Sequence, residues 1–305
     1  MSCRVGGRKG TDSIFRQRGV KAVMLHYESL IHMGREEIYQ SFLKAFSDYQ
    51  VPMNMTFSQF EKMLKRRGFD PNVSVGAFEE DSLVGFILNG CRTWNGKATA
   101  YDVGTGVIPQ FRKQGITNHM LQTARQNFGK SGVEQYVLEV LTANTSAANI
   151  YIKNGFTVER EFLCCQMDWG KNRTDLLQQA EQVMDPDWEL FVKFWDYQPS
   201  WQNSIQSIEA ARENFDISAV RINNCIVGYG IIDKSTGEIP QIAVDKNWRN
   251  KGIGSIILTD LINQTSSNQI KILNIDTRGD AMLQFITATG FYNTVNQYEM
   301  KLELR

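Results

Sequence analysis

Two short segments of the sequence carry residues that suit the binding of a phosphate group. The first runs from Arg112 to Gly115 and the second from Arg249 to Gly252, and each places basic side chains beside a glycine. Each follows a strand-like stretch and opens a helix with apolar residues at helical spacing. A helix N-terminus presents unpaired amides and a partial positive charge, and glycine lets the backbone approach an anion. The segments therefore predict two anion-binding helix N-termini.

Neither segment has the glycine spacing of the common nucleotide-binding loops, because both G-x-x-x-x-G-K-[ST] and G-x-G-x-x-G are absent. The two segments are instead related to each other. Gly252 lies 137 positions after Gly115, and each copy closes with a Gly-Phe pair, Gly155-Phe156 or Gly290-Phe291. The glycine-to-glycine distances are 40 and 38 residues. An internal repeat of this kind predicts two domains of one fold.

Hydrophobic periodicity predicts the elements that position these loops. The turn composition of Glu79–Ser82 and Asn95-Gly96 separates the early strands. Strands that alternate with helices predict an α/β chain. The expected helices cover 36–46 and 57–67, and the expected strands cover 73–78, 83–88, 98–108, 136–141, 241–244 and 270–275.

The spacing of the loops resembles the [QR]-x-x-G-x-[GA] motif of the GNAT superfamily of N-acetyltransferases. A second motif of that family, E-x(4)-N-x-x-A-x-x-L-Y-x-x-x-G-F, closely resembles the run from Glu139 through Asn144 and Tyr151 to Phe156. The resemblance covers about 21–169 as one whole domain and about 183–305 more loosely. It implies an α/β fold of the α+β type, with two GNAT-like domains. Each would be a mixed, mainly antiparallel sheet that splays between two parallel strands, with helices on both faces.

The resemblance also implies a cofactor, acetyl-CoA, and the residues that would hold it. In the family, the central strand pairs with the pantetheine arm and the loop amides bind the pyrophosphate. The implied contacts are Thr105, Gly106 and Val107 for the arm, Lys113, Gln114, Gly115, Ile116, Thr117 and Asn118 for the pyrophosphate, and Asn144 as a hydrogen-bond partner of the arm. Thr117 departs from the family pattern, which prefers glycine or alanine, and its branched side chain crowds the cofactor's approach.

Two residues match family positions that handle protons. Tyr151 is implied to protonate the departing thiolate, and Glu139 to help remove a proton from the amine. A lysine-like amine has a pKa of about 10.4, so its deprotonation at pH 7 costs roughly 4.6 kcal/mol, and a carboxylate can accept that proton through water. A phenol stays protonated at neutral pH and can serve as the acid. Direct attack in a ternary complex needs no covalent intermediate, and we predict no metal site.

The second copy keeps the loop but lacks the other groups. Counted back from Gly290-Phe291, Ile286 occupies the tyrosine position, Gly279 the asparagine position and Asn274 the glutamate position. We expect a degenerate C-terminal domain that can still bind CoA, and catalysis there by other groups is the alternative. Its possible cofactor contacts are Ile242, Ala243, Val244, Asn250, Lys251, Gly252, Ile253, Gly254 and Ser255.

The length of 305 residues suits two domains. We place a flexible leader at 1–20, with an Arg-rich targeting presequence as the alternative. A catalytic N-terminal domain follows at 21–170, then a linker at 171–182 and the degenerate domain at 183–305. One aromatic and methionine-rich group has two interpretations, an apolar acceptor pocket or a helix-packing core. Its members are Tyr49, Met53, Met55, Phe57 and Trp94.

Composition narrows the choice of partners and compartment. The 33 lysines and arginines balance 33 aspartates and glutamates, which disfavours nucleic acid and anionic membranes as partners. No apolar run approaches the roughly 18–20 residues of a membrane span. Five cysteines without C-x-x-C spacing are typical of reduced, mostly buried thiols in a cytoplasmic protein.

The sequence therefore predicts a cytoplasmic, acetyl-CoA-dependent N-acetyltransferase that acts on an amine of a small molecule or peptide. The alternatives are a non-catalytic acyl-CoA-binding or regulatory protein, and catalysis in the C-terminal domain. The acceptor and the oligomeric state stay open.

Overall fold

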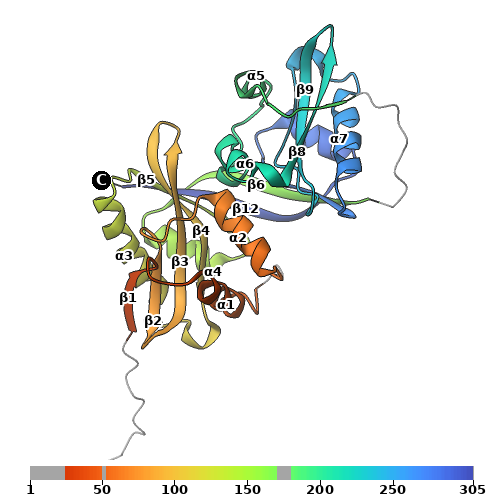
Figure 1. Ribbon diagram of the computed structural model, residues 1–305. Coiled ribbons are helices and arrows are strands. Elements are labelled where there is room, and N and C mark those ends of the chain that lie inside the picture. The colour runs from red at the N-terminus through yellow and green to blue at the C-terminus, as the bar shows by residue number, and fades with distance from the viewer. Residues whose placement is uncertain (1–24, 50–52, 170–179, 305) are drawn as a thin grey trace, which may run out of the picture.

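The computed structural model describes residues 25–49, 53–169 and 180–304. The predicted leader and most of the predicted linker lie outside these residues. Two units of strands and helices, an N-terminal half and a C-terminal half, lie side by side (Figure 1). Both halves combine helices with sheets in which antiparallel pairs predominate, so the predicted fold class is confirmed.

The N-terminal half contains six strands and four α-helices among the described residues. Both helices expected before residue 70 are confirmed, and a capping box at Thr56 fixes the start of the second. The strand expected at 83–88 continues to Trp94. The elements are β1 (Leu25–Ser29), α1 (Arg35–Ala45), α2 (Phe57–Arg67), β2 (Val75–Glu79), β3 (Ser82–Trp94), β4 (Lys97–Val107), α3 (Ile116–Lys130), β5 (Gln135–Leu141), α4 (Thr145–Lys153) and β6 (Thr157–Asp168).

The C-terminal half repeats the order strand, loop, helix, strand, helix, strand that runs from β4 to β6. The repeat predicted from the loop spacings is therefore visible in the fold. Its elements are β7 (Glu181–Gln182), α5 (Trp188–Val192), α6 (Ile205–Ala210), β8 (Phe215–Ile222), β9 (Cys225–Asp233), β10 (Gln241–Val244), α7 (Ile253–Gln264), β11 (Gln269–Asp276), α8 (Asp280–Ala288) and β12 (Tyr292–Glu303). Short 3₁₀ turns include η1 (Pro109–Phe111) and η2 (Trp201–Asn203).

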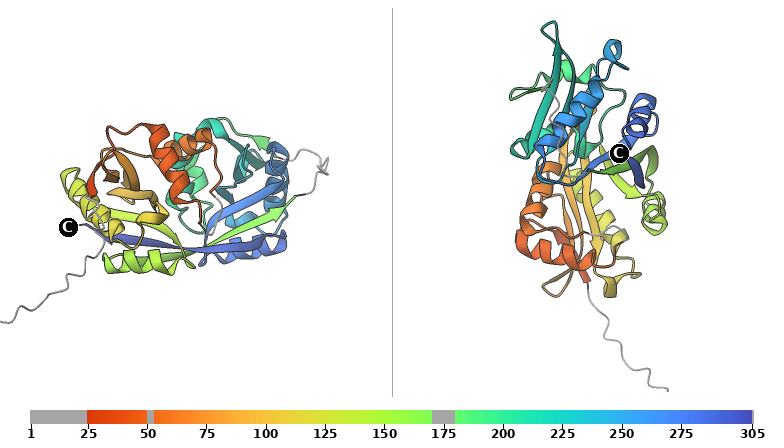
Figure 2. Two further views of the ribbon diagram at one scale, coloured as in Figure 1. Left: turned by 90° about the horizontal axis from the view of Figure 1, so that it is seen from below. Right: turned by 90° about the vertical axis from the view of Figure 1, so that its right-hand side faces the viewer.

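The last strand of each half lies inside the sheet of the other half. The larger sheet has the order β1-β2-β3-β4-β5-β12-β6-β11, and the smaller one has the order β10-β9-β8-β7. β12 therefore separates β5 from β6, and β6 separates β12 from β11. Figure 2 shows β6 and β12 as long neighbouring strands that cross from one half into the other. The two halves thus exchange strands reciprocally.

The exchanged strands complete the cores that they enter. Met300 and Leu302 of β12 are buried in the core under α3 and α4, and Cys165 and Met167 of β6 are buried in the C-terminal core. Full burial of such an apolar side chain contributes about 1.5–3 kcal/mol. Each core therefore depends on residues from the other half.

The sheet opens between two parallel strands in each half. β4 pairs with β5 only from Thr99–Tyr101 opposite Gln135–Val137, after which the two strands separate. In the C-terminal half, the equivalent contact shrinks to one parallel bridge, from Glu238 just before β10 to Lys271 of β11. Helices α3 and α4 cover one face of the N-terminal sheet and α1 and α2 cover the other, so both faces are closed around the opening.

The exchange predicts that a core change in β12 destabilises the N-terminal half. Met300→Ala removes a fully buried side chain and should lower the free energy of unfolding by about 2–5 kcal/mol. Because Met300 pairs with Leu138, the amides of β5 should lose hydrogen-exchange protection. Val158→Ala, at a half-exposed position of β6, is the control and should change stability by less than about 0.5 kcal/mol. Loss of protection confined to β8–β11 would contradict the exchange.

Candidate functional site

The two predicted loops share one backbone conformation. Lys113 and Gly115 have φ angles of 62° and 77°, and Asn250 and Gly252 have φ angles of 59° and 81°. Left-handed residues alternate with right-handed or extended ones, which turns successive amides toward one concave side. The helices that follow have no side-chain cap, so their first amides are open to an anion.

A cavity of about 580 Å³ joins the first loop to the end of β4 and the start of α4. Asp48 and Tyr49 after α1 close its rim. Two predicted residues, Gln114 and Glu139, do not line it. Ten do, namely Thr105, Gly106, Val107, Lys113, Gly115, Ile116, Thr117, Asn118, Asn144 and Tyr151.

The guanidinium of Arg112 makes contacts within the protein rather than facing a ligand. Its guanidinium binds both carboxylate oxygens of Asp48 at 2.7 Å and donates to the carbonyl of Val107 at 3.0 Å, which ties the end of α1 to the end of β4. The C-terminal half repeats the clip, since Arg249 binds Asp196 at 2.7 Å. These contacts leave the loop amides, rather than the arginines, as the expected phosphate partners.

The repeat extends further than the loop alone. Residues 46–49 read Phe-Ser-Asp-Tyr and residues 194–197 read Phe-Trp-Asp-Tyr, and each segment follows the helix that the arginine clips. The sequence analysis missed this second repeated segment. Its signal, a shared Phe-x-Asp-Tyr-Gln string, is present in the sequence but only four letters match.

Tyr151 is buried in the cavity wall beside a carboxyl group that the sequence analysis did not single out. The Tyr151 hydroxyl lies 3.3 Å from Asp102 Oδ2, and the hydroxyl of Thr105 donates to the same oxygen at 2.6 Å. In a regular strand, positions 102 and 105 would face opposite sides. A bulge in β4, where Val103 is the extra residue opposite β3, restores them to one side.

Burial raises the pKa of Asp102 to about 6. The hydrogen bonds from Thr105 and Tyr151 and the charge of Arg67 oppose this rise without cancelling it. The phenol of Tyr151 has a pKa well above its usual range, first because of burial and then because of Asp102. Tyr151 therefore stays protonated at neutral pH, as a general acid must.

Glu139 lies on the other face of the sheet. Tyr101 donates to its Oε2 at 2.8 Å and Gln202 approaches the same oxygen at 3.3 Å, while Oε1 is inaccessible and unpaired within the described residues. Burial raises the pKa of Glu139, and the charge of Arg67 opposes that rise. The Trp201 ring stacks on Tyr101 at 5.0 Å, so η2 of the C-terminal half covers this carboxylate.

Asn144 and most of the aromatic and methionine-rich group defined above stabilise the fold. The side chain of Asn144 caps α4, because its Oδ1 accepts from the Ala147 amide at 3.2 Å. Trp94 is buried against Trp201, which fits the helix-packing interpretation. Met53, Met55 and Phe57 pack on the α1–α2 core as well, and of the group only Tyr49 lines the cavity.

The second loop has a smaller cavity of about 440 Å³. Lys251 stays outside it and places its ammonium over the Trp248 ring at 4.5 Å. A Cβ on Gly254 would lie 2.9 Å from the Phe285 ring, and one on Gly279 would lie 2.6 Å from the Tyr197 ring. The predicted residues that line the cavity are Ile242, Ala243, Val244, Asn250, Gly252, Ile253, Gly254 and Ser255.

The glycine at position 279, where the first repeat has Asn144, also has a packing role. Its missing side chain makes room for Tyr197, which occupies the position in the second repeat that Tyr49 has in the first. With Ile286 buried in place of a tyrosine, the two cavities differ in their chemistry but share their loop.

The sequence model of the Acetyltransferase (GNAT) family matches this chain twice, at residues 35–156 and at residues 177–291. The chain belongs to this family. As a GNAT protein it has the transferase fold twice in one chain. None of the curated proteins compared matches its sequence.

Solved structures support the tandem GNAT arrangement at the level of the fold. The GCN5-related N-acetyltransferase from Sphaerobacter thermophilus is 13% identical and has a TM-score of 0.68 over 92% of this chain and 96% of that one. A tandem GNAT protein from the clavulanic acid biosynthesis pathway is 14% identical, with a TM-score of 0.66 over 92% and 99%. A glucosamine N-acetyltransferase region of a fungal β-N-acetylglucosaminidase is 12% identical, with a TM-score of 0.68 over 93% and 38%.

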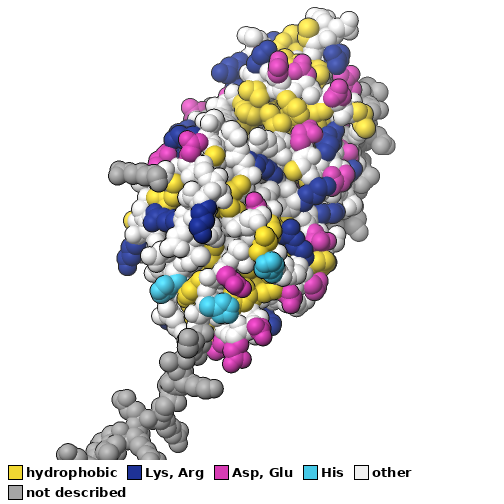
Figure 3. Space-filling model, turned by 60° about the vertical axis from the view of Figure 1, so that its left-hand side comes forward, with side chains coloured by type: hydrophobic (Ala, Val, Ile, Leu, Met, Phe, Trp, Pro, Cys, Tyr) yellow, Lys and Arg dark blue, Asp and Glu magenta, His cyan; other side chains and the backbone are white. Residues whose placement is uncertain are grey.

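The findings on membrane-spanning helices, metal-binding clusters and thiols apply to the described residues only. There, no helix is long and apolar enough to cross a membrane, and no cluster of three metal-binding side chains is found. Of the four described cysteines, all free thiols, Cys164 and Cys165 are buried, Cys91 is half-buried and Cys225 is exposed. The expectation of mostly buried thiols is thus met only in part. Figure 3 shows basic and acidic side chains interspersed over one face.

The raised pKa of Asp102 predicts a pH-dependent stability difference. A buried carboxyl with a raised pKa contributes most stability below its unfolded pKa of about 3.8, and this contribution is lost as the pH rises through about 6. Asp102→Asn removes that dependence. Relative to the wild type, the variant should gain about 2 kcal/mol in free energy of unfolding between pH 4 and pH 7.5, measured by denaturant titration. A difference that stays constant over this range would contradict the assignment.

Proposed function

We propose that the N-terminal half transfers an acetyl group from acetyl-CoA to an amine. The observation that carries this proposal is that one cavity contains the open amides of α3, the free end of β4 and the phenol of Tyr151. These are the three groups that a thioester on a phosphate-bearing arm requires. Membership of the Acetyltransferase (GNAT) family supports acyl-CoA-dependent acetyl transfer as the class of reaction.

The residues divide the task by position. The backbone from Lys113 to Asn118 holds the pyrophosphate, and the strand end Thr105–Val107, which no longer pairs with β5, offers amides and carbonyls to the pantetheine arm. Bound acetyl-CoA supplies an activated acyl group and a thiolate leaving group. Tyr151 donates its proton toward that sulfur, and its buried position excludes water from the reacting carbon.

Glu139 is proposed to accept the amine proton from the opposite face of the opened sheet. Its Oε1 has no partner in the described residues, while Oε2 is held by Tyr101 and Gln202. Burial raises its pKa, which makes it a stronger base than an exposed carboxylate. Because η2 covers this carboxylate, the proton of a small-molecule or peptide amine would reach Glu139 through water rather than by direct contact.

The C-terminal half is proposed to bind CoA without catalysing the reaction. Its loop has the same backbone as the first, and its cavity is open. Ile286 and Asn274 cannot act as acid and base, which favours a structural or regulatory role for this half. We retain the cytoplasm as the proposed location and acetyl-CoA with an amine acceptor as the proposed partners.

The first test removes the proposed acid. Tyr151→Phe keeps the ring and deletes the hydroxyl, so kcat should fall about 10²–10⁴-fold while KM for acetyl-CoA changes little. The measurement is thiol release across a panel of small amines and peptides. Tyr292→Phe, which loses the hydroxyl of an exposed residue at the start of β12, is the matched control and should keep wild-type turnover. A fully active Tyr151→Phe enzyme would refute the role of this residue.

The second test separates the two loops. Asn118→Asp and Ser255→Asp each place a carboxylate in the first turn of the helix where a pyrophosphate would bind, at exposed positions that tolerate it. Repulsion between the carboxylate and the phosphates should raise KM for acetyl-CoA about tenfold or more in Asn118→Asp. Ser255→Asp should leave kcat and KM nearly unchanged. The reverse pattern would move the active centre to the C-terminal half.

A further inference from the structure

Asp102 lies directly behind Tyr151 and is not satisfied by its surroundings. The residue is only 8% exposed, and its Oδ2 accepts the bonds from Thr105 and Tyr151. Its Oδ1 is fully buried without a hydrogen-bond partner in the described residues. Within the same residues, the only other carboxylate oxygen in this condition is Oε1 of Glu139.

The unpaired Oδ1 of Asp102 lowers the stability of the fold, so a functional role would explain why the carboxylate is buried here. A buried carboxylate oxygen without a donor costs on the order of 1–3 kcal/mol or more. The chain also departs from regular strand geometry here, because the bulge at Val103 turns Thr105 toward Asp102. Bulges beside active sites commonly redirect side chains for function.

We propose that Asp102 is a positioning residue that exchanges protons with Tyr151 during acetyl transfer. The proposal rests on the proposed function of the N-terminal half. In its acid form, Asp102 donates a hydrogen bond to the phenol oxygen, and the phenol hydroxyl then points into the cavity instead of toward Asp102. In its anionic form, Asp102 accepts that hydroxyl at its Oδ2, which lies 3.3 Å from the phenol oxygen.

The protons and electron pairs balance over one cycle of acetyl transfer. As the amine nitrogen bonds to the acyl carbon and the carbon–sulfur bond breaks, the electron pair of that bond moves to sulfur. The phenol proton of Tyr151 moves to sulfur, and the proton of Asp102 moves to the phenol oxygen. The new amide nitrogen loses one proton to Glu139, the base of the proposed function. After the products leave, Glu139 releases that proton to solvent and Asp102 takes one up from solvent, so one proton has passed from nitrogen to sulfur and all three side chains are restored.

The charged and titratable groups around Asp102 are compatible with this exchange. Arg67 of α2 favours the anion, whereas burial favours the acid. Tyr136 on β5 and Tyr151 on α4 lie on the same face as the carboxyl, whereas Tyr101 on β4 faces the other side and donates to Glu139. All three are neutral phenols, since burial raises the pKa of each well above its usual range. The resulting pKa of about 6 lets both forms of Asp102 exist near neutral pH.

The test compares Asp102→Asn with the wild type. The asparagine has the same shape but cannot exchange protons, so kcat should fall about 10–100-fold while KM for acetyl-CoA changes less than twofold. The decline of the wild-type kcat as the pH rises through the pKa of Asp102 should be absent from the variant. Asp216→Asn, an aspartate paired with Lys234 in the C-terminal half, is the control and should keep the wild-type profile.

A double mutant distinguishes exchange from a packing defect. If Asp102 acts only through Tyr151, Asp102→Asn with Tyr151→Phe should be no slower than Tyr151→Phe alone. Fully additive losses, or an Asp102→Asn enzyme with the wild-type kcat and pH profile, would overturn the inference. If Tyr151→Phe is itself fully active, it is instead the proposed function that fails.

Discussion

The reciprocal exchange of β6 and β12 is the constraint on which the rest of this structure depends. Each strand pairs on both sides, β12 with β5 and β6, and β6 with β12 and β11, so neither half has a complete sheet of its own. A ladder shared in this way fixes the distance and orientation of the two halves. It also places β5, the strand that carries Glu139, against a strand from the other end of the chain.

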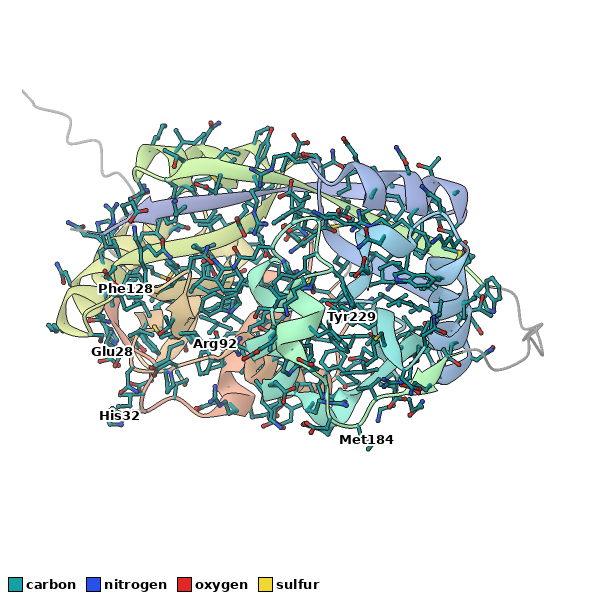
Figure 4. All side chains as sticks on the ribbon, turned by 90° about the horizontal axis from the view of Figure 1, so that it is seen from above. Glu28, His32, Arg92, Phe128, Met184 and Tyr229 are labelled. Carbon is teal, nitrogen blue, oxygen red and sulfur yellow. The ribbon has the colours of Figure 1, made fainter. Side chains whose placement is uncertain are left out.

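A buried set of charges secures this junction. Arg160 of β6 binds Glu299 of β12 at 2.7 Å through two nitrogens and also reaches Asp276 of β11, and all three side chains are at most 8% exposed. Nearby, Arg92 donates to Ser207 at 2.6 Å, and Figure 4 places it where the halves meet. A partner lost from such a set would leave an unpaired buried charge, which costs about 3–5 kcal/mol. The junction therefore specifies one arrangement of the halves.

The local parts of this account follow from the sequence, and the long-range parts do not. The loop at Gly115 and the helical periodicity of α3 depend on neighbouring residues, and both are visible in the sequence. The exchange was not predicted, because the alternation of β12 specifies which face is buried but not which strand lies beside it. Asp102 was missed because its approach to Thr105 depends on a bulge. Arg112 seemed available to phosphate because its partner, Asp48, lies 64 positions away.

The central claim is that acetyl-CoA is used in the N-terminal cavity, with its sulfur beside Tyr151. The most direct measurement is a crystal structure of the whole chain with CoA at a concentration just sufficient for activity. The account predicts the pyrophosphate on the amides of Lys113–Asn118, the arm along Thr105–Val107, and the sulfur within hydrogen-bond distance of the Tyr151 hydroxyl. CoA found only on the loop at Gly252, with the N-terminal cavity empty, would contradict it.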